Sequence, residues 1–204
     1  MKAIVRDTYG SPDVLEIRDI DKPVTKDHDV LVRVRATAVN PPDWAALTGV
    51  PYIARLAFGL RKPRNCVGGS DVAGVVEAIG TSVTRLRVGD EVFGAGAGTF
   101  AEYAVAAEEH LVPKPAHVTF EQAAAVPMAG MVALQALRDH GRIQLGQKVL
   151  INGAGGGIGT FAVQIAKSFG AEVTGVCSTT KVDMVRFDRR RPRHRLHGRR
   201  LHPG

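Results

Sequence analysis

The sequence predicts an α/β protein with a β-rich N-terminal part followed by a parallel-sheet domain. Short apolar stretches separated by glycine and proline fill the first 120 residues, a pattern typical of many short strands. Beyond residue 120 the pattern changes to helices and then to a strand, a helix and a second strand. A glycine-rich turn joins the first of these strands to its helix. We therefore expect two units of different architecture.

Residues 1–120 are predicted to form a compact barrel. The strongest signal is the stretch 29–36, where apolar and charged side chains alternate as in a half-buried strand. Gly-Asp at 89–90 indicates a turn that leads into another strand. Strands are expected at 2–5, 14–17, 29–36, 72–80 and 88–94.

Residues 121–186 are predicted to begin a doubly wound domain. Thr119 is the expected N-cap of a helix at 120–126, which Pro127 interrupts, and a helix is expected again at 132–139. Strands at 148–152 and 172–176 flank a helix at 158–169. In that helix Phe161, Ile165 and Phe169 recur every four residues, which predicts an apolar stripe facing a sheet.

The net charge of +7 comes almost entirely from the last eighteen residues. These hold seven arginines and one aspartate, whereas the rest of the chain holds 20 basic and 19 acidic residues. Cys66 and Cys177 form no CxxC pair, so we expect a reducing, cytoplasmic compartment. No apolar run reaches the ~18 residues of a membrane span, and we expect no membrane partner.

The glycine-rich turn predicts a dinucleotide site. Counted from Ala154, it reads A-x-G-x-x-G, close to the dinucleotide fingerprint with its first glycine replaced. Gly156 would let the backbone approach a pyrophosphate, and Gly159 would let the helix pack closely. The alternative, a glycine-rich surface turn, does not explain the ordered strand–turn–helix context. The predicted cofactor-binding residues here are Ala154, Gly155, Gly156, Gly157, Ile158 and Gly159.

The end of the second strand predicts a preference for NADPH. A carboxylate there would bind the ribose 2′-hydroxyl of NAD, but Cys177 occupies the place, followed by Ser178, Thr179 and Lys181. Hydroxyls and an ammonium can bind a 2′-phosphate. The alternative is that Lys181 simply opens the next helix.

With these residues in place, the chain resembles the zinc-free, zeta-crystallin-like quinone oxidoreductases of the medium-chain dehydrogenase/reductase superfamily. The likeness covers residues 1–186 and rests on segments that follow the family order. These segments are MKAIVRDTYGSPDVLEI, VRVRATAVNPPDW, GGSDVAGVVEAIG, VGDEVFG, GTFAEYAV, EQAAAVPMAGMVALQAL and INGAGGGIGTFAVQIAKSFGAEVTGV. The resemblance implies a GroES-like catalytic domain at 1–120 and a partial Rossmann NADPH-binding domain at 121–186.

The resemblance also bears on metal binding. Zinc-dependent relatives carry ligands at positions that match Asn40, Ser70–Asp71 and residues 127–129. Only Asp71 is a ligand type, whereas a catalytic zinc needs three, so we expect no metal. A structural zinc would need four clustered cysteines, which the chain lacks.

Several residues before Gly68 gain expected roles from the resemblance. Asn40 would contact the cofactor near the nicotinamide ribose, or else cap a turn before Pro41. Asp43 would belong to the substrate site or act as a helix N-cap. Trp44 and Tyr52 would line the substrate pocket, although aromatic residues at such places are more often core.

The implied activity is zinc-free hydride transfer from NADPH to a quinone or conjugated carbonyl, by an enzyme whose intact relatives form homodimers. The sequence names no general acid, so the catalytic residues are unknown. The alternative is a non-catalytic remnant or binding fragment that pairs with an intact homologue.

Residues 187–204 are expected to be a disordered basic tail on a C-terminally truncated chain. A family-like continuation, written in GC-rich codons with one extra T, translates to the observed run from Phe187 to Leu196, which suggests a frameshift. The rival interpretation is a nucleic-acid-binding tail, since arginines attract phosphates, but we do not expect nucleic acid as a partner.

Overall fold

The computed structural model describes residues 1–187 and divides into two compact units. The first unit is Met1–Met128, and the second begins at Ala129. The predicted basic tail, apart from Phe187, lies outside the described residues.

The first unit opens with a two-stranded antiparallel hairpin. Strand β1 (Lys2–Val5) pairs with β2 (Glu16–Asp19), with Ile4 opposite Ile17. The strand predicted at 14–17 is therefore displaced toward the C-terminus. Residues Pro12–Val14 form a 3-10 turn (η1), because proline fixes its own φ and favours the start of such a turn.

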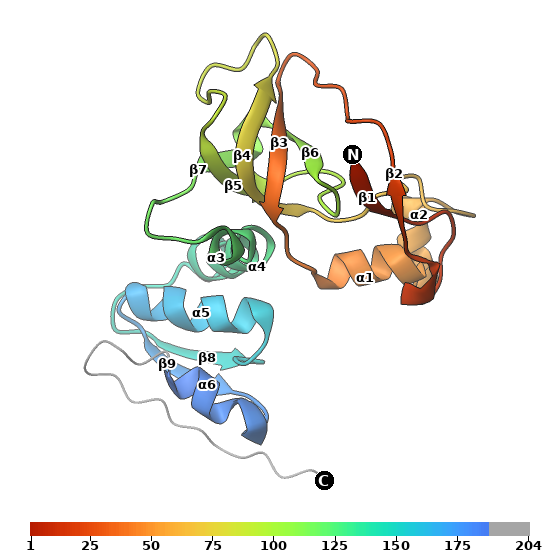
Figure 1. Ribbon diagram of the computed structural model, residues 1–204. Coiled ribbons are helices and arrows are strands. Elements are labelled where there is room, and N and C mark those ends of the chain that lie inside the picture. Colours follow the sequence, from red (N-terminus) through yellow and green to blue (C-terminus); the bar gives the residue numbers. More distant parts are fainter. Residues whose placement is uncertain (188–204) are drawn as a thin grey trace. The chain divides into compact units, whose positions relative to one another are not determined.

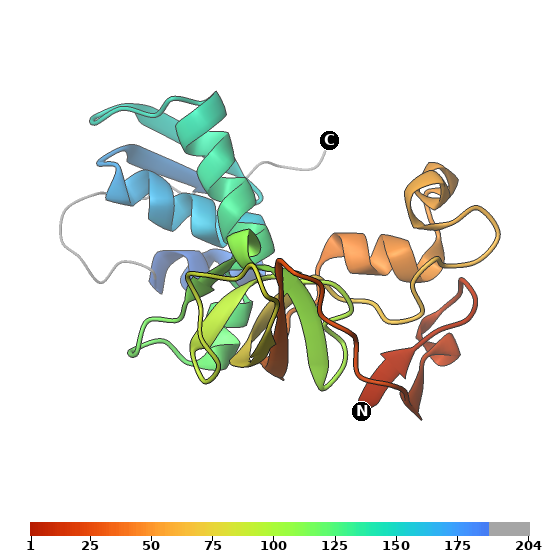
Figure 2. The ribbon, with the colours of Figure 1, turned by 90° about the horizontal axis from the view of Figure 1, so that it is seen from above.

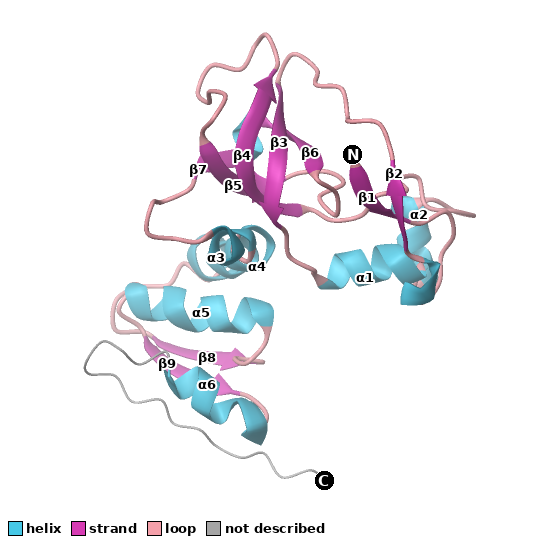
Figure 3. Ribbon diagram, in the orientation of Figure 1, coloured by secondary structure: helices cyan, strands magenta, loops and turns pink. Residues whose placement is uncertain are grey.

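A five-stranded antiparallel sheet forms the body of the first unit (Figures 1 and 3). Its order is β6-β3-β4-β5-β7. The strands are β3 (Asp29–Ala36), β4 (Asp71–Ile79), β5 (Glu91–Ala95), β6 (Tyr103–Ala107) and β7 (Leu111–Pro113). Alternate residues of β3 and β4 point into one apolar core, which includes Val30, Val32, Val72 and Val76. The strand predicted at 29–36 is confirmed, although Val30, Leu31 and Val32 are all buried, whereas β6 and β7 were not predicted.

Short helices complete the first unit. The helices α1 (Pro41–Thr48) and α2 (Arg55–Phe58), joined through the 3-10 turn η2 (Tyr52–Ala54), follow β3. A further 3-10 turn, η3 (Glu108–His110), precedes β7. Helix α3 (Phe120–Ala124) buries Ala123 and Ala124 against Ala73 of β4. Thr119 is its N-cap, as predicted, and forms a capping box with Gln122.

Helix α4 (Pro127–Leu134) differs from the expectation. The helical run is broken before Pro127, as predicted, because α3 ends at Ala124; Pro127 itself begins α4, since the first helical position needs no N–H donor. The helix continues as a π-helical stretch, η4 (Gln135–His140). The helix expected at 132–139 thus starts earlier than predicted.

The second unit contains a strand–helix–strand motif. Strands β8 (Lys148–Asn152) and β9 (Glu172–Val176) are parallel, and α5 (Gly157–Ser168) connects them. Both predicted strands are confirmed at their exact bounds. The chain then forms the 3-10 turn η5 (Thr179–Lys181) and helix α6 (Val182–Phe187).

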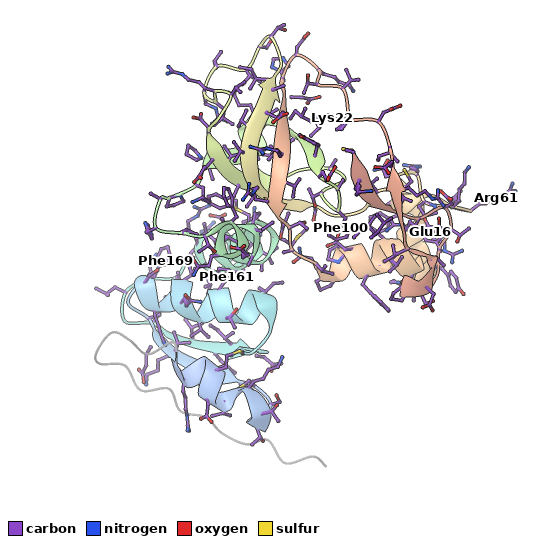
Figure 4. All side chains as sticks on the ribbon, viewed as in Figure 1. Glu16, Lys22, Arg61, Phe100, Phe161 and Phe169 are labelled. Carbon is purple, nitrogen blue, oxygen red and sulfur yellow. The ribbon has the colours of Figure 1, made fainter. Side chains whose placement is uncertain are left out.

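The buried face of α5 differs from the predicted stripe. Gly159, Ala162, Val163 and Ala166 are its buried residues, and they belong, glycine apart, to the apolar core of the second unit. Phe161 and Ile165 pack only partly against this core, and Phe169 is more than one-third exposed. Figure 4 labels Phe161 and Phe169 on α5 and just after it. Small side chains face the strands because they let the helix approach closely.

The described residues thus form a mixed α/β chain whose β-rich first part precedes a parallel strand pair, as predicted. Among residues 1–187, no helix is long and apolar enough to cross a bilayer.

Candidate functional site

The glycine-rich turn between β8 and α5 is closed by its own backbone bonds. Gly153 adopts a φ of +76°, a conformation that favours glycine. The N–H of Gly156 donates to the carbonyl of Gly153 at 2.9 Å. The N–H of Ala154 donates to Val176 at 2.9 Å, which ties the turn to the end of β9. The turn is therefore held in one shape before any ligand binds.

Two glycines of this turn have opposite surroundings. A Cβ on Gly159 would lie 2.1 Å from the carbonyl oxygen of Gly153, so only glycine fits where helix and turn meet. A Cβ on Gly157 would meet nothing within 4 Å. The space in front of the first helical residue is thus open.

The first turn of α5 offers unpaired donors to this open space. Within the described part of the chain, the N–H groups of Gly157, Ile158 and Gly159 have no backbone acceptor. Such groups carry the positive end of the helix dipole and bind phosphate oxygens. The turn therefore fits the pyrophosphate of a dinucleotide, which would be held by backbone donors rather than by side chains.

The segment after β9 contains hydroxyls and an ammonium but no carboxylate. Ser178 precedes η5, and its Oγ lies 3.1 Å from Oγ1 of Thr180. The Nζ of Lys181 donates to the carbonyl of Gly155 at 3.1 Å. The stem of Lys181 also covers Gly155, because a Cβ there would lie 2.8 Å from the lysine Cδ. The structure thus brings Lys181 onto the glycine turn, 26 residues away in sequence, and also places it just before α6.

A separate polar cluster lies in the first unit around Asp71. Asp71 is 1% exposed, and its carboxylate accepts two hydrogen bonds, from Nδ2 of Asn40 at 2.9 Å and from the N–H of Met128 at 3.1 Å. Burial raises the pKa of Asp71, and the bonds from Asn40 and Met128 oppose this shift. Thr37 donates to the carbonyl of Asp71 at 2.7 Å. Asp71 therefore joins the beginnings of α1 and α4.

Asn40 is the N-cap of α1 and forms a capping box with Asp43. Its backbone N–H donates to Oδ2 of Asp43 at 2.8 Å. Asn40 thus has the capping position that was one of its two expected roles, and its contact with a cofactor stays a prediction. Asp43 is the third helical residue rather than the N-cap, so that alternative for Asp43 is wrong.

Burial also raises the pKa of Asp43, while the bond from Asn40 and the nearby Arg6 lower it. Arg6 is a residue that the sequence analysis missed. It is buried, its Nε has no hydrogen-bond partner among the described residues, and burial lowers its pKa. No local pattern marks Arg6, because its surroundings come from distant parts of the chain.

Trp44 and Tyr52 both expose their rings. Trp44 lies on α1 and Tyr52 begins η2, and more than half of each residue is accessible. The competing interpretation of these aromatic residues as core is therefore wrong. Among the described residues, no three His, Cys, Asp or Glu side chains are grouped to hold a metal ion.

Comparisons with known proteins agree with this architecture. Residues 26–116 match the family of the alcohol dehydrogenase GroES-like domain. The quinone oxidoreductase of Homo sapiens is 36% identical over 182 residues, which cover 88% of this chain and 53% of the human protein. That of Pseudomonas aeruginosa is 39% identical over 173 residues, covering 84% and 51%. The chain spans about half the length of these curated relatives.

Solved structures show the same likeness. A quinone oxidoreductase from Coxiella burnetii superposes with a TM-score of 0.82 at 32% identity, covering 93% of this chain and 60% of the other. A mycobacterial protein in complex with NADPH gives a TM-score of 0.81 at 28% identity, covering 93% and 57%.

Proposed function

Because this chain belongs to the quinone oxidoreductase group of the medium-chain dehydrogenase/reductase superfamily, we propose that it binds NADPH at the glycine turn of its second unit. We further propose that the protein of which this fold is part reduces quinones or conjugated carbonyls. The mycobacterial relative, solved with NADPH, supports the choice of cofactor.

One observation carries the binding proposal, namely the open, donor-rich start of α5. The N–H groups of Gly157, Ile158 and Gly159 would hold the pyrophosphate. Gly159 keeps the helix against the turn, and Ala154 and Gly155 complete the loop around it. These groups are fixed before binding, so little ordering entropy is lost when the ligand arrives.

Lys181 would select NADPH over NADH. Its ammonium lies 3.1 Å from the Gly155 carbonyl, at the end of β9 where NAD-binding proteins carry a carboxylate. When a 2′-phosphate binds, the Lys181 ammonium would donate to a charged phosphate oxygen in place of the neutral Gly155 carbonyl. Hydrogen bonds between charged groups are stronger than those to a neutral acceptor. Ser178 and Thr179 would add hydroxyl donors.

The chemistry that NADPH supplies is a hydride from its nicotinamide. The roles proposed for the first unit are contacts with the cofactor by Asn40 and with the acceptor by Asp43, Trp44 and Tyr52. The exposed rings of Trp44 and Tyr52 are available for a planar acceptor.

Nicotinamide fluorescence, followed while NADPH and NADH are titrated separately into the chain, tests the proposal. We expect saturable binding with a preference for NADPH. In Lys181→Ala that preference should shrink by about tenfold or more, since a charged hydrogen bond contributes ~1.5–3 kcal/mol. Lys167→Ala, which removes a lysine of α5 away from the turn, is the matched control and should bind as the parent does. Equal affinities for both nucleotides, or no binding by a folded chain, would refute the proposal.

A further inference from the structure

Positive charge is concentrated in one segment of the first unit, residues 44–70. Of the 20 basic residues before Phe187, four lie here, against none of the 19 acidic residues. The four are Arg55, Arg61, Lys62 and Arg64. The last three are exposed, and none forms an ion pair with another described residue within 4.0 Å. Arg61 points outward in Figure 4.

The same segment exposes large apolar side chains. Tyr52, Ile53, Leu56 and Leu60 are 73%, 73%, 64% and 67% exposed. The turn η2 runs directly into α2, so Leu56 lies three and four positions after Ile53 and Tyr52, on a shared face. Scattered single apolar residues are normal on a surface, but a contiguous set marks an interaction site.

This apolar–basic segment (residues 50–64) is fastened to the first unit. The Nε of Arg55 donates to the carbonyl of Gly49 at 3.1 Å, and its guanidinium lies 4.6 Å and 4.8 Å from the rings of Tyr9 and Tyr52. The hydroxyl of Tyr9 donates to the carbonyl of Gly59 at 2.6 Å. These contacts hold the backbone of the segment against the first unit. It projects from the first unit, away from the five-stranded sheet (Figures 1 and 2).

We propose that the apolar–basic segment binds the surface of a bilayer that contains anionic phospholipids. Apolar side chains enter the boundary between headgroups and acyl chains, and neighbouring cations pair with lipid phosphates. A second copy of the same segment would bring like charges together, and a purely acidic protein surface would leave the aliphatic side chains of Ile53, Leu56 and Leu60 without an apolar partner. This proposal departs from the expectation of no membrane partner, which rested on the absence of a spanning run, because surface attachment needs no run of that length.

The inference stands apart from the proposed function because vesicle binding requires neither NADPH nor an acceptor. It is tested by co-sedimenting the full chain with vesicles of phosphatidylcholine alone and of equal parts phosphatidylcholine and phosphatidylglycerol. We expect binding to the mixed vesicles that is much stronger than to the neutral ones. Failure to bind the mixed vesicles would overturn the inference.

Two variants separate the two kinds of contact. The charge variant is Arg61→Gln, Lys62→Gln and Arg64→Gln, and the apolar variant is Ile53→Ser, Leu56→Ser and Leu60→Ser. At ~1 kcal/mol for each surface cation, the charge variant should lose on the order of a hundredfold in affinity for the mixed vesicles. The apolar variant should lose at least about tenfold, since each buried methylene contributes ~0.8 kcal/mol.

Matched controls change exposed side chains of the same kinds elsewhere. They are Lys26→Gln with Arg87→Gln and Lys148→Gln, and Val24→Ser with Val88→Ser and Leu145→Ser. Both controls should bind within about twofold of the parent chain. We expect every variant to remain folded, because every altered side chain is exposed, and circular dichroism of each variant checks this.

The arginines after Phe187 also attract anionic lipid, so one further full-length variant replaces all seven of them by glutamine. In this background, adding the three substitutions of the charge variant should still weaken binding to the mixed vesicles. If binding is lost with these seven arginines and is indifferent to the apolar–basic segment, the inference is wrong.

Discussion

Replacing Gly159 by alanine places a methyl group against the backbone of the turn before α5. The new Cβ would lie 2.1 Å from the Gly153 carbonyl oxygen and 2.8 Å from Cα of Ala154. Both neighbours are backbone atoms that cannot rotate away, so the helix or the turn must move. Overpacking of this kind costs ~1–3 kcal/mol. For a small domain, each kcal/mol lowers the midpoint of thermal unfolding by roughly 4–8 °C.

Gly157→Ala is the matched control, since its methyl group would meet nothing within 4 Å. Alanine favours a helix over glycine by up to ~1 kcal/mol, so this variant should unfold at the parent temperature or above it. Its methyl group, however, enters the space proposed for the cofactor phosphates. We expect its affinity for NADPH to fall by about tenfold, which corresponds to ~1.4 kcal/mol.

Thermal unfolding by circular dichroism and NADPH titration of both variants separate stability from binding. The expected pattern is a lower midpoint for Gly159→Ala, and weaker binding without a lower midpoint for Gly157→Ala. Equal midpoints for the parent and Gly159→Ala would refute the close packing of helix and turn. Unchanged NADPH affinity in Gly157→Ala would refute the phosphate position.

Three further predictions concern the first unit. Thr119→Ala removes the oxygen that accepts from the N–H of Gln122 at 3.2 Å and should cost ~1 kcal/mol in chemical denaturation; no loss would mean that the cap adds nothing. Asp71→Asn should gain stability relative to the parent as pH rises from 4.5 to 7.5. Burial raises the pKa of Asp71, so the folded parent binds the Asp71 proton more tightly than the unfolded chain does. The stability that this proton contributes to the parent is therefore lost as pH rises through the folded-state pKa. Urea denaturation at both pH values checks this, and the opposite trend would contradict it. Lys114→Met keeps the buried stem but removes the donor to the Val118 carbonyl at 2.6 Å, which should cost ~1–2 kcal/mol. Glu91→Gln should cost less, because Glu91 is half-exposed and solvent weakens its direct 3.0 Å ion pair with Lys114; a larger loss for Glu91→Gln in the same denaturation assay would contradict this ranking.

Local patterns in the sequence were sufficient for several elements. The alternation at 29–36 predicted β3 at its exact bounds, and apolar runs bounded by glycine predicted β8 and β9. Thr119 was predicted as a cap because a threonine directly before a run of helix formers is a local signal. Such features depend on neighbours within one or two turns of chain, which the sequence displays directly.

Local patterns were insufficient for the start of one helix and for the buried face of another. The helix break at Pro127 was predicted, but Pro127 is also the first residue of the next helix, which was expected only from residue 132. The stripe of Phe161, Ile165 and Phe169 has helical spacing, but the closer approach of Ala162, Val163 and Ala166 makes these the buried residues. Periodicity identifies the faces of a helix, but it does not give the distance between the helix and the neighbouring strand, which decides which residues are buried.

The sequence by itself determined the two architectures, the strands of the parallel pair and the glycine turn, because these follow from periodicity and from the backbone freedom of glycine. Only the tertiary structure decided which distant groups meet. It brought Lys181 to Gly155, joined Asn40 and Met128 through the buried carboxylate of Asp71, and left the apolar side chains beside Arg61 in water. The physical reason is that each of these outcomes depends on residues far apart in the chain, whose approach is set by the packing of whole elements and leaves no trace in the local pattern.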